Sequence, residues 1–261
     1  MTTRPLAVVT GASGGLGYEF ARLLAERGHD LVLIARSGAP MEELAQWAEA
    51  RHGVAVTVLP KDLSHPGAGG EVADELARRD LHADVLINNA GFTQLAPFAE
   101  SDEQVMLSLL RVNIEALTQL TRRIAPGMVA RGRGRIVNLA SNAAFQPGPF
   151  MACYYASKAY VLNFSIALHE ELRDTGVSVT ALAPGPVATG FQARAAMENA
   201  RIVKGRKLPS AAEVAEWGWA EAEKGKPFAV HSARWKFFAF TTRFLPRPTA
   251  ARLAARTNDT V

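Results

Sequence analysis

"LAVVTGASGGLG", residues 6–17, joins a short apolar run directly to a cluster of glycines. The apolar run has the length and composition of a buried strand, and an amphipathic stretch near 16–28 follows the glycines at once. Gly11, Gly15 and Gly17 permit a tight turn, close approach of the backbone to a pyrophosphate, and close packing of the helix. Because a helix N-terminus attracts phosphate charge, the segment predicts a dinucleotide-binding site. An ordinary turn between strand and helix is the alternative that a glycine cluster alone leaves open.

The same alternation of apolar runs and amphipathic stretches continues as far as residue 185. Strands are expected at 6–10, 31–35, 54–59, 84–88, 135–140 and 177–183, and helices near 16–28, 40–52, 68–79, 102–130, 153–174 and 211–224. Strands that alternate with helices predict a doubly wound, Rossmann-type α/β fold, in which a parallel sheet carries helices on both faces. Since no linker or repeat divides the chain, we expect one domain over residues 1–261. Its expected parts are a cofactor-binding and catalytic core (1–190), a substrate loop and helix (190–225) and a C-terminal extension (226–261).

The composition is that of a soluble globular protein, with 261 residues, of which 48% are hydrophobic and 21% charged. No apolar run has the length of a membrane span, and the N-terminus lacks the apolar core of a secretion signal. A single cysteine, Cys153, excludes an internal disulfide and fits a reducing compartment, so a cytoplasmic location is expected. The net charge of +4 comes from residues 226–261, which hold seven Lys and Arg against one Asp. The rest of the chain is slightly acidic, so no nucleic-acid partner is expected.

The end of the second expected strand bears on the choice of cofactor. A site that prefers NAD usually presents an acidic residue here to the ribose hydroxyls, but this chain has Ala35 followed by Arg36. An acid would repel a 2′-phosphate, whereas the Arg36 guanidinium can bind it through charge-assisted hydrogen bonds. The pair favours NADP(H) over NAD(H); a solvated arginine at a strand end is the alternative.

Five separated motifs agree in order and spacing with one protein family. They are TGASGGLG (10–17), NNAG (88–91), Ser141, Tyr154 with Lys158, and PGPVAT (184–189). On these motifs, residues 5–190 resemble the short-chain dehydrogenase/reductase family. The resemblance implies an oxidoreductase that transfers a hydride between NADP(H) and a carbonyl or secondary alcohol substrate. No metal is expected.

The resemblance implies catalytic roles for Asn113, Ser141, Tyr154 and Lys158. Tyr154 would exchange a proton with the carbonyl oxygen, Ser141 would donate a hydrogen bond to that oxygen, and Asn113 would hold a water that links the lysine to solvent. Lys158 would bind the nicotinamide ribose and, together with the positive nicotinamide, lower the Tyr154 pKa from about 10 toward about 7. If the segment is helical, the neighbouring Tyr155 points about a quarter-turn away, so we expect it to pack or to line the pocket wall.

The resemblance also implies a set of cofactor contacts drawn from several loops. They are Gly11, Ser13, Gly14, Gly15, Leu16 and Gly17 at the phosphates, Arg36 at the 2′-phosphate, Asp62 and Leu63 beside the adenine, Asn89, Ala90 and Gly91 along the adenosine ribose, Pro184, Val187 and Thr189 at the carboxamide and phosphates, and Tyr154 and Lys158 beside the nicotinamide. In isolation, each of these residues could equally be an ordinary loop or turn residue without a binding role. Their order along the chain is what makes them candidates.

Beyond residue 190 the resemblance thins. Residues 190–210 correspond to the variable substrate loop, and the glycine-rich ending of the acyl-carrier-protein reductases is absent, which favours a hydrophobic ketone, alcohol or acyl substrate. The C-terminal extension interleaves Arg and Lys with Trp235, Phe237, Phe238, Phe240, Phe244 and Leu245. We expect two short helices, broken near Pro246 and Pro248, packed over the pocket or against a neighbouring subunit. Contact with a membrane surface is the alternative.

The expected helices at 102–130 and 153–174 match those that pack between subunits in the family, which implies a homodimer or homotetramer. Two other functions remain open besides the oxidoreductase: a cofactor-binding sensor without turnover, and a membrane-surface reductase that modifies lipids. The complete catalytic set argues against the sensor. The substrate and the direction of the reaction stay open.

Overall fold

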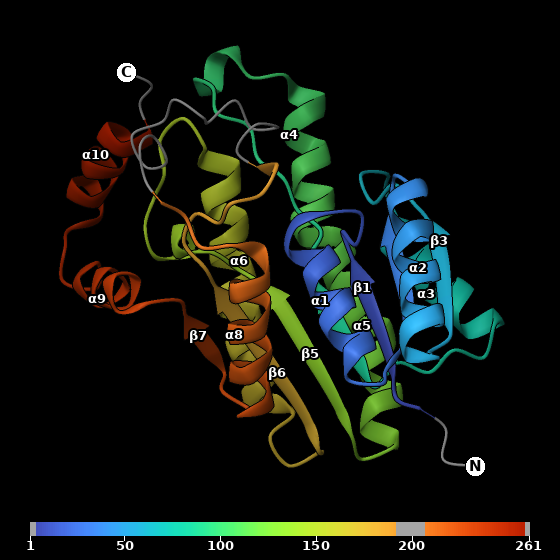
Figure 1. Cartoon of the computed structure of the whole chain (residues 1–261). Helices are drawn as coiled ribbons and strands as arrows, with labels where there is room; N and C mark the ends of the chain where they lie inside the picture. The colour runs from blue at the N-terminus through green and yellow to red at the C-terminus, as the bar shows by residue number, and fades with distance from the viewer. Residues whose placement is uncertain (1–3, 192–206, 259–261) are drawn as a thin grey trace.

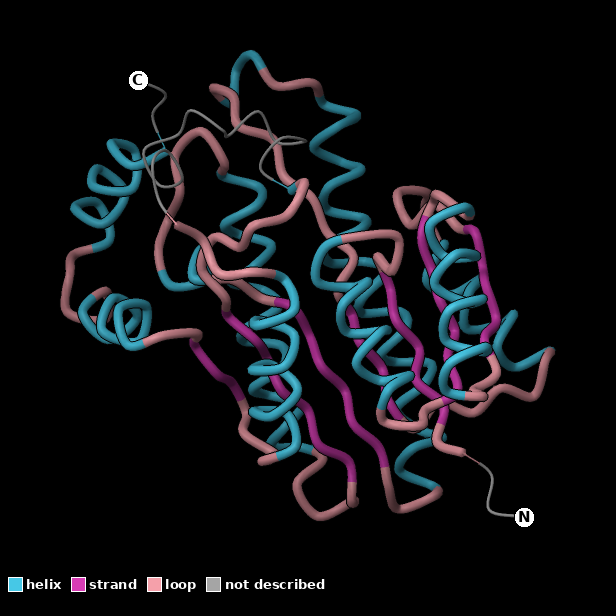
Figure 2. Tube along the Cα trace, viewed as in Figure 1, coloured by secondary structure: helices cyan, strands magenta, loops and turns pink. Residues whose placement is uncertain are grey.

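The computed structural model of the chain describes residues 4–191 and 207–258. Its strands form one parallel sheet in the order β3–β2–β1–β4–β5–β6–β7 (Figures 1 and 2). The strands are β1 (Leu6–Thr10), β2 (Asp30–Ala35), β3 (Val56–Pro60), β4 (Val85–Asn88), β5 (Gly134–Leu139), β6 (Val177–Ala183) and β7 (Phe228–Val230). The predicted Rossmann-type fold is confirmed. Because the strand order reverses between β1 and β4, the loops after these strands diverge and open a crevice at the carboxyl edge.

Helices cover both faces of the sheet (Figure 1). On one face α1, α2 and α8 pack through a core that contains Phe20, Leu44 and Trp219. On the other face α3, α5 and α6 pack around Val72 and Leu120. The helices are α1 (Gly15–Glu26), α2 (Ala39–His52), α3 (Ala68–Arg78), α4 (Glu103–Leu110), α5 (Leu117–Ala130), α6 (Ala152–Glu171), α8 (Ala211–Glu223), α9 (Ala233–Thr241) and α10 (Arg247–Asn258).

Two elements differ from those expected from the sequence. The seventh strand, β7, is only three residues long, too short for its apolar pattern to be told from a loop, and it pairs with β6 at the sheet edge. The single helix expected over 102–130 is divided into α4 and α5 by a π-helical segment, Arg111–Ala116. Such segments are frequent at functional sites, and this one carries Asn113.

The C-terminal extension contains the two expected helices, α9 and α10; of the two prolines expected to break them, Pro246 lies between the helices and Pro248 lies in the first turn of α10. The inner face of α9 packs on the sheet edge, where Ala239 joins Ala183 and Val230 in one apolar cluster. The Trp235 indole lies against the backbone of Gly185, so closely that a Cβ at this glycine would collide with the ring. This half of the extension is packed as expected.

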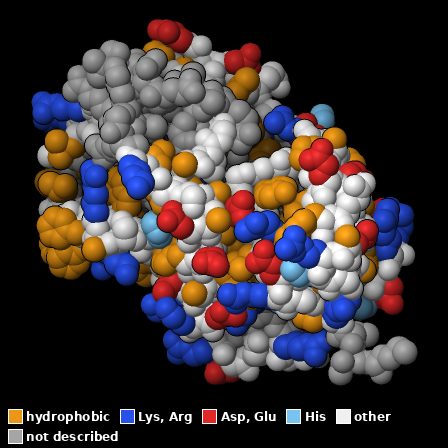
Figure 3. Space-filling model, in the orientation of Figure 1, with side chains coloured by type: hydrophobic (Ala, Val, Ile, Leu, Met, Phe, Trp, Pro, Cys, Tyr) orange, Lys and Arg blue, Asp and Glu red, His pale blue; other side chains and the backbone are white. Residues whose placement is uncertain are grey.

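The outer face of α9 is exposed in the single chain. Phe237 and Phe240 are 70% and 56% exposed, and Phe244, just beyond the helix, is 74% exposed. Figure 3 shows a hydrophobic patch at the left edge of the molecule. The expected burial of the aromatic side chains therefore holds for one face of the helix only. Among the described residues, no helix combines the length and the apolar character that a membrane span requires.

Candidate active site

The glycine loop between β1 and α1 is shaped partly by contacts inside the chain. A Cβ at Gly17 would collide with the Gly11 carbonyl and the Asn89 side chain, and a Cβ at Gly11 would lie 2.7 Å from Asn89 Nδ2. Gly14 differs, because a Cβ there would meet no atom within 4 Å. The open side of the loop lies at the N-terminus of α1, whose first turn holds no acidic residue. This geometry fits a loop that approaches the phosphates of a dinucleotide.

Thr10 and Asn89 brace the glycine loop against the loop that follows β4. Thr10 Oγ1 accepts hydrogen bonds from the backbone N–H groups of Asn89 and Ala90, each at 3.0 Å. Asn89 Nδ2 donates to the carbonyl oxygens of Thr10 at 3.0 Å and Gly11 at 3.3 Å. The Asn89 amide thus holds two loops together, and its pairing with Thr10 was not predicted.

Arg36 directly follows β2 at one end of the cavity, where it is exposed to solvent. Lys61 and Asp62 line the same end from the loop after β3. Burial acts to raise the pKa of Asp62, but hydrogen bonds from Ser64 and the charge of Arg36 hold that pKa below its ordinary value. Lys61, which also pairs with Glu71, was not predicted; it adds a second cation near Arg36. Two cations at this end suit a phosphorylated ribose.

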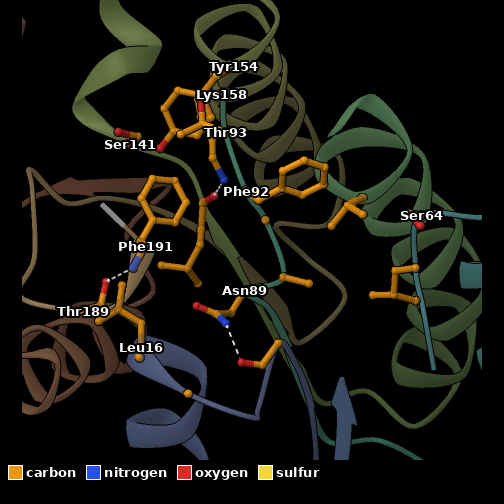
Figure 4. A pocket seen from close by; sticks show the side chains of 18 of the residues that line it. Leu16, Ser64, Asn89, Phe92, Thr93, Ser141, Tyr154, Lys158, Thr189 and Phe191 are labelled. Carbon is orange, nitrogen blue, oxygen red and sulfur yellow. Dashed lines mark hydrogen bonds between the residues drawn. The ribbon is translucent and has the colours of Figure 1, made fainter. Parts of the chain in front are cut away.

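Ser141, Tyr154 and Lys158 meet near the middle of the cavity (Figure 4). Ser141 follows β5, and its Oγ accepts a hydrogen bond from the Ala143 backbone N–H at 3.2 Å. Tyr154 and Lys158 come from the first two turns of α6, one turn apart on the same side of the helix. The Tyr154 hydroxyl is hydrogen-bonded to Ser141. The predicted pair of hydroxyls is therefore brought together by a strand end and a helix.

Lys158 is buried behind the tyrosine. Its Nζ donates a hydrogen bond to the Leu139 carbonyl oxygen at 2.6 Å and lies 5.8 Å from the centre of the Tyr154 ring. Burial lowers the pKa of the Lys158 ammonium to about 8. A lysine whose pKa lies near neutrality is characteristic of functional sites.

Burial also raises the pKa of the Tyr154 phenol to about 12, although its hydrogen bond with Ser141 acts in the opposite direction. In the chain by itself the Tyr154 pKa thus shifts upward; the lowered pKa expected from the sequence also depends on the positive nicotinamide and stays a prediction for the cofactor complex. The physical reason for both shifts is desolvation, because burial disfavours the charged phenolate and the charged ammonium alike. Near neutral pH the Tyr154 phenol is therefore neutral, whereas Lys158 keeps its charge but gives up its proton more readily than an exposed lysine.

Asn113 lies in the π-helical segment, 1% exposed, with every hydrogen bond of its side chain made inside the protein core. Its Nδ2 donates to the Phe92 carbonyl oxygen at 3.2 Å and to Ser157 Oγ at 3.0 Å, and its Oδ1 accepts from the Phe92 N–H at 3.1 Å. A Cβ at Gly91 would lie 3.1 Å from Asn113 Oδ1 and 3.5 Å from Lys158 Nζ. Asn113 and Lys158 thus lie close together behind Gly91.

The other end of the cavity is lined mainly by apolar and aromatic side chains. Phe191 lies 5.9 Å from Tyr154 between ring centres, and Met151 and Tyr155 form a cluster with Ala143. Tyr155 is 6% exposed, and its hydroxyl donates to Asn258 Oδ1 in α10 at 3.0 Å. Tyr155 is thus a pocket-wall residue, as expected from the sequence.

One cavity of about 910 Å³ joins the two ends. The predicted residues that line it are Gly11, Ser13, Gly14, Gly15, Leu16, Arg36, Asp62, Leu63, Asn89, Ala90, Gly91, Ser141, Tyr154, Lys158, Pro184, Val187 and Thr189. Gly17 and Asn113 lie behind the wall and support it. Other residues line the cavity without having been predicted, among them Ser37, Lys61, Ser64, Thr93, Met151 and Phe191. They belong to none of the sequence motifs, and only the fold brings them to the site. The size, the glycine loop and the cations fit a bound dinucleotide with space for a substrate.

A family model described as short chain dehydrogenase matches residues 5–200, and the chain therefore belongs to the short-chain dehydrogenase family. Within it, a very-long-chain 3-oxoacyl-CoA reductase-like protein of Arabidopsis thaliana is 33% identical over 236 residues, which cover 88% of this chain and 74% of that protein. The very-long-chain 3-oxoacyl-CoA reductase of Bos taurus is 34% identical over 187 residues, which cover 70% of this chain. The chain spans 52–60% of the length of this and six further curated relatives.

Two solved structures match nearly the whole chain. A short-chain dehydrogenase from Sphingobium yanoikuyae in complex with NADPH is 33% identical, with a TM-score of 0.82 and coverage of 92% of this chain and 94% of that one. The bulky-bulky ketone specific alcohol dehydrogenase from Comamonas testosteroni is 30% identical, with a TM-score of 0.79 and coverage of 93% and 94%.

Proposed function

We propose that the protein is an NADP(H)-dependent oxidoreductase that interconverts a bulky hydrophobic ketone and the corresponding secondary alcohol. The observation that carries this proposal is the position of Ser141, Tyr154 and Lys158 in one cavity with the glycine loop. A sensor without turnover has no need of a buried lysine behind a tyrosine and a serine that share a hydrogen bond.

Bound NADP(H) supplies or accepts the hydride. The chain's own residues handle the proton and the charge that develops on the carbonyl oxygen. The neutral Tyr154 hydroxyl donates the proton to that oxygen, and Ser141 donates a hydrogen bond to it. Lys158 binds the ribose of the cofactor and favours the phenolate that remains on Tyr154. Asn113 holds the segment around Phe92 in place next to Lys158.

The cofactor preference is supported by the cations at the adenosine end. Arg36 is exposed, and Lys61 lines the same cavity, with its backbone N–H bonded to the carbonyl oxygen of Ala35. Both can bind a 2′-phosphate, and Arg36 can do so with two hydrogen bonds. The NADPH complex of the Sphingobium yanoikuyae relative supports the same assignment.

The substrate class is supported by the apolar end of the cavity. Met151, Tyr155 and Phe191 offer apolar surface beside Tyr154, as a site for a bulky hydrophobic group requires. The named substrates of two relatives, a bulky ketone and a very-long-chain 3-oxoacyl thioester, share a ketone beside a large hydrophobic group. We favour the ketone over the thioester because the Comamonas testosteroni enzyme matches along nearly its whole length.

We further propose a homodimer or homotetramer in the cytoplasm. The outward face of α6 supports the assembly, since Tyr160 is 37% exposed and stacks on Phe164 at 5.5 Å. The single cysteine supports a reducing compartment. Light scattering of the purified protein at micromolar concentration measures the assembly, and a stable monomer would contradict it.

The function is tested by following NADPH absorbance with a series of ketones that increase in size, and NADP⁺ reduction with the matching alcohols. Turnover is expected with the bulky apolar members, and it should be lost in Tyr154→Phe prepared in parallel. NADPH binding without turnover on any member of the series would instead favour the cofactor-binding sensor.

A further inference from the structure

The C-terminal helix reaches the substrate end of the cavity through one side chain. Asn258, in the last turn of α10, is 1% exposed. Its Oδ1 accepts the hydrogen bond from the Tyr155 hydroxyl at 3.0 Å, and its Nδ2 donates to the Pro149 carbonyl oxygen at 3.0 Å. One buried amide therefore ties together two segments that precede it by more than 100 residues.

Tyr155 lies between this amide and the catalytic centre. Its ring packs on the backbone of Gly148, where a Cβ would collide with it. The same ring meets that of Tyr154 edge-on, with centres 6.1 Å apart and an interplanar angle of 78°. A shift of the Tyr155 ring would change the apolar surface beside the catalytic hydroxyl.

We propose that Asn258 is a positioning residue that determines substrate specificity. It acts through Tyr155 and the turn at 148–150, and it fixes the cavity wall that receives the bulky group of the substrate. This inference rests on the proposed function. Asn258 itself does not contact the cavity, so it is not a catalytic residue.

The chemistry of the contact explains why an amide is suited to this position. The Tyr155 hydroxyl needs an acceptor and the Pro149 carbonyl oxygen needs a donor, and an asparagine side chain supplies both at once. A buried polar network in which both groups are satisfied favours a single arrangement of the surrounding side chains. The other buried positions of α10, Ala250 and Ala254, are small and apolar, so they hold the helix in place without specifying the position of the Tyr155 ring.

The experiment compares wild type with Asn258→Ala, Tyr155→Phe and the double variant, with Thr257→Ala as control. Thr257 is the preceding residue of the same helix, is exposed, and bonds only within α10 in the described structure. For each protein, kcat and KM are measured with a bulky and a small ketone at saturating NADPH. Thermal unfolding of each protein is measured alongside.

Asn258→Ala is expected to raise KM for the bulky ketone by about 5–10-fold, the effect of losing a buried hydrogen bond, while kcat changes less than about threefold. KM for the small ketone should stay within about twofold, because a small group does not reach this wall. Tyr155→Phe should act in the same direction, and the double variant should be no worse than Asn258→Ala, since both changes remove the hydrogen bond between Tyr155 and Asn258. Thr257→Ala should match wild type.

A proportional loss of activity on both ketones would assign Asn258 a purely structural role and overturn the inference. Additive effects in the double variant would also overturn it. If Asn258→Ala does not fold, Tyr155→Phe decides, because it deletes one oxygen and keeps the ring. Absence of turnover in wild type with every ketone would instead overturn the proposed function, so the two failures are distinguishable.

Discussion

The two ends of the cavity are built in different ways. The phosphate and adenosine end is made by loops that directly follow β1, β2, β3 and β4, and much of its surface is backbone or glycine. The substrate end is made by side chains from distant segments, with Met151, Tyr155 and Phe191 on its surface and α10 behind it. One end is therefore fixed by a local motif, and the other by long-range packing.

This difference has a physical origin. A phosphate is bound by N–H groups at the start of a helix, and a strand, a glycine turn and a helix suffice to present them. A hydrophobic group is bound by shape and apolar area, which neighbouring residues of one loop rarely supply. The cofactor end of the site can therefore be found from a motif, whereas the substrate end requires the fold.

The largest loss of activity is expected for a change at Tyr154, which lies where the two ends of the cavity meet. Tyr154→Phe should reduce kcat by roughly 10²–10⁴-fold with little change in NADPH affinity, because only the proton donor is removed. Tyr155→Phe is the matched control, since it changes the neighbouring ring in the same way, and its kcat should stay within a few-fold of wild type. Steady-state kinetics and cofactor titration measure both. The opposite pattern would show that the catalytic tyrosine has been misassigned.

The next largest effect, a loss of folding stability, is expected when the packing of the C-terminal extension is disturbed. Trp235→Ala removes an indole that packs on Gly185, and it should lower the free energy of unfolding by about 3 kcal/mol. Phe237→Ala, on the outer face of the same helix, should change it by less than about 0.5 kcal/mol. Urea unfolding measures both. Equal losses in the two variants would mean that the outer face is also covered, as it would be by a second subunit.

The cofactor preference of the adenosine end is tested by replacing Arg36, its exposed cation. Arg36→Ala should weaken NADPH binding by roughly 1.5–3 kcal/mol and leave NADH binding nearly unchanged, because the lost contact is made only to the 2′-phosphate. Arg51→Ala, an exposed arginine in the last turn of α2, is the control. Calorimetric titration with both nucleotides gives the values. Equal affinity of wild type for NADPH and NADH would refute the role of Arg36.

The smallest expected effect is the change of folding stability with pH that the buried Lys158 causes. The folded pKa of Lys158 is lowered to about 8 from 10.5, so between these values the unfolded chain binds a proton that the folded chain has released. Stability therefore rises with pH in this window, by about 2 kcal/mol between about pH 7 and pH 9.5. Lys158→Met should lack this contribution.

The measurement is urea unfolding of both proteins at the two pH values, without nucleotide. The raised pKa of Tyr154 has the opposite sign and acts mainly above pH 10, where the folded chain keeps a proton that the unfolded chain loses. Identical pH dependence in wild type and Lys158→Met would contradict the lowered pKa of Lys158 in the folded chain.

Much of the candidate site was predictable from the sequence, because its motifs are short and local. The predicted residues of the glycine loop, Arg36, Ser141, Tyr154 and Lys158 lie at strand ends or one helical turn apart, and of these only Gly17 does not line the cavity. The protonation of Tyr154 was not predictable in this way, since burial depends on every element packed around α6. The three-residue strand β7 was missed because its position is set by pairing with β6 rather than by its own pattern.

The sequence by itself determined the parallel sheet, the glycine loop and the family, because strand and helix periodicity and βα-turn chemistry are local properties of the chain. Only the tertiary structure decided which face of α9 is buried, that Asn258 bonds to Tyr155, and that burial raises the pKa of Tyr154 and lowers that of Lys158. These features depend on contacts between residues that are far apart in the chain, such as the 103 positions between Tyr155 and Asn258. Burial and long-range hydrogen bonds arise when the chain folds, and no local pattern of residues encodes them.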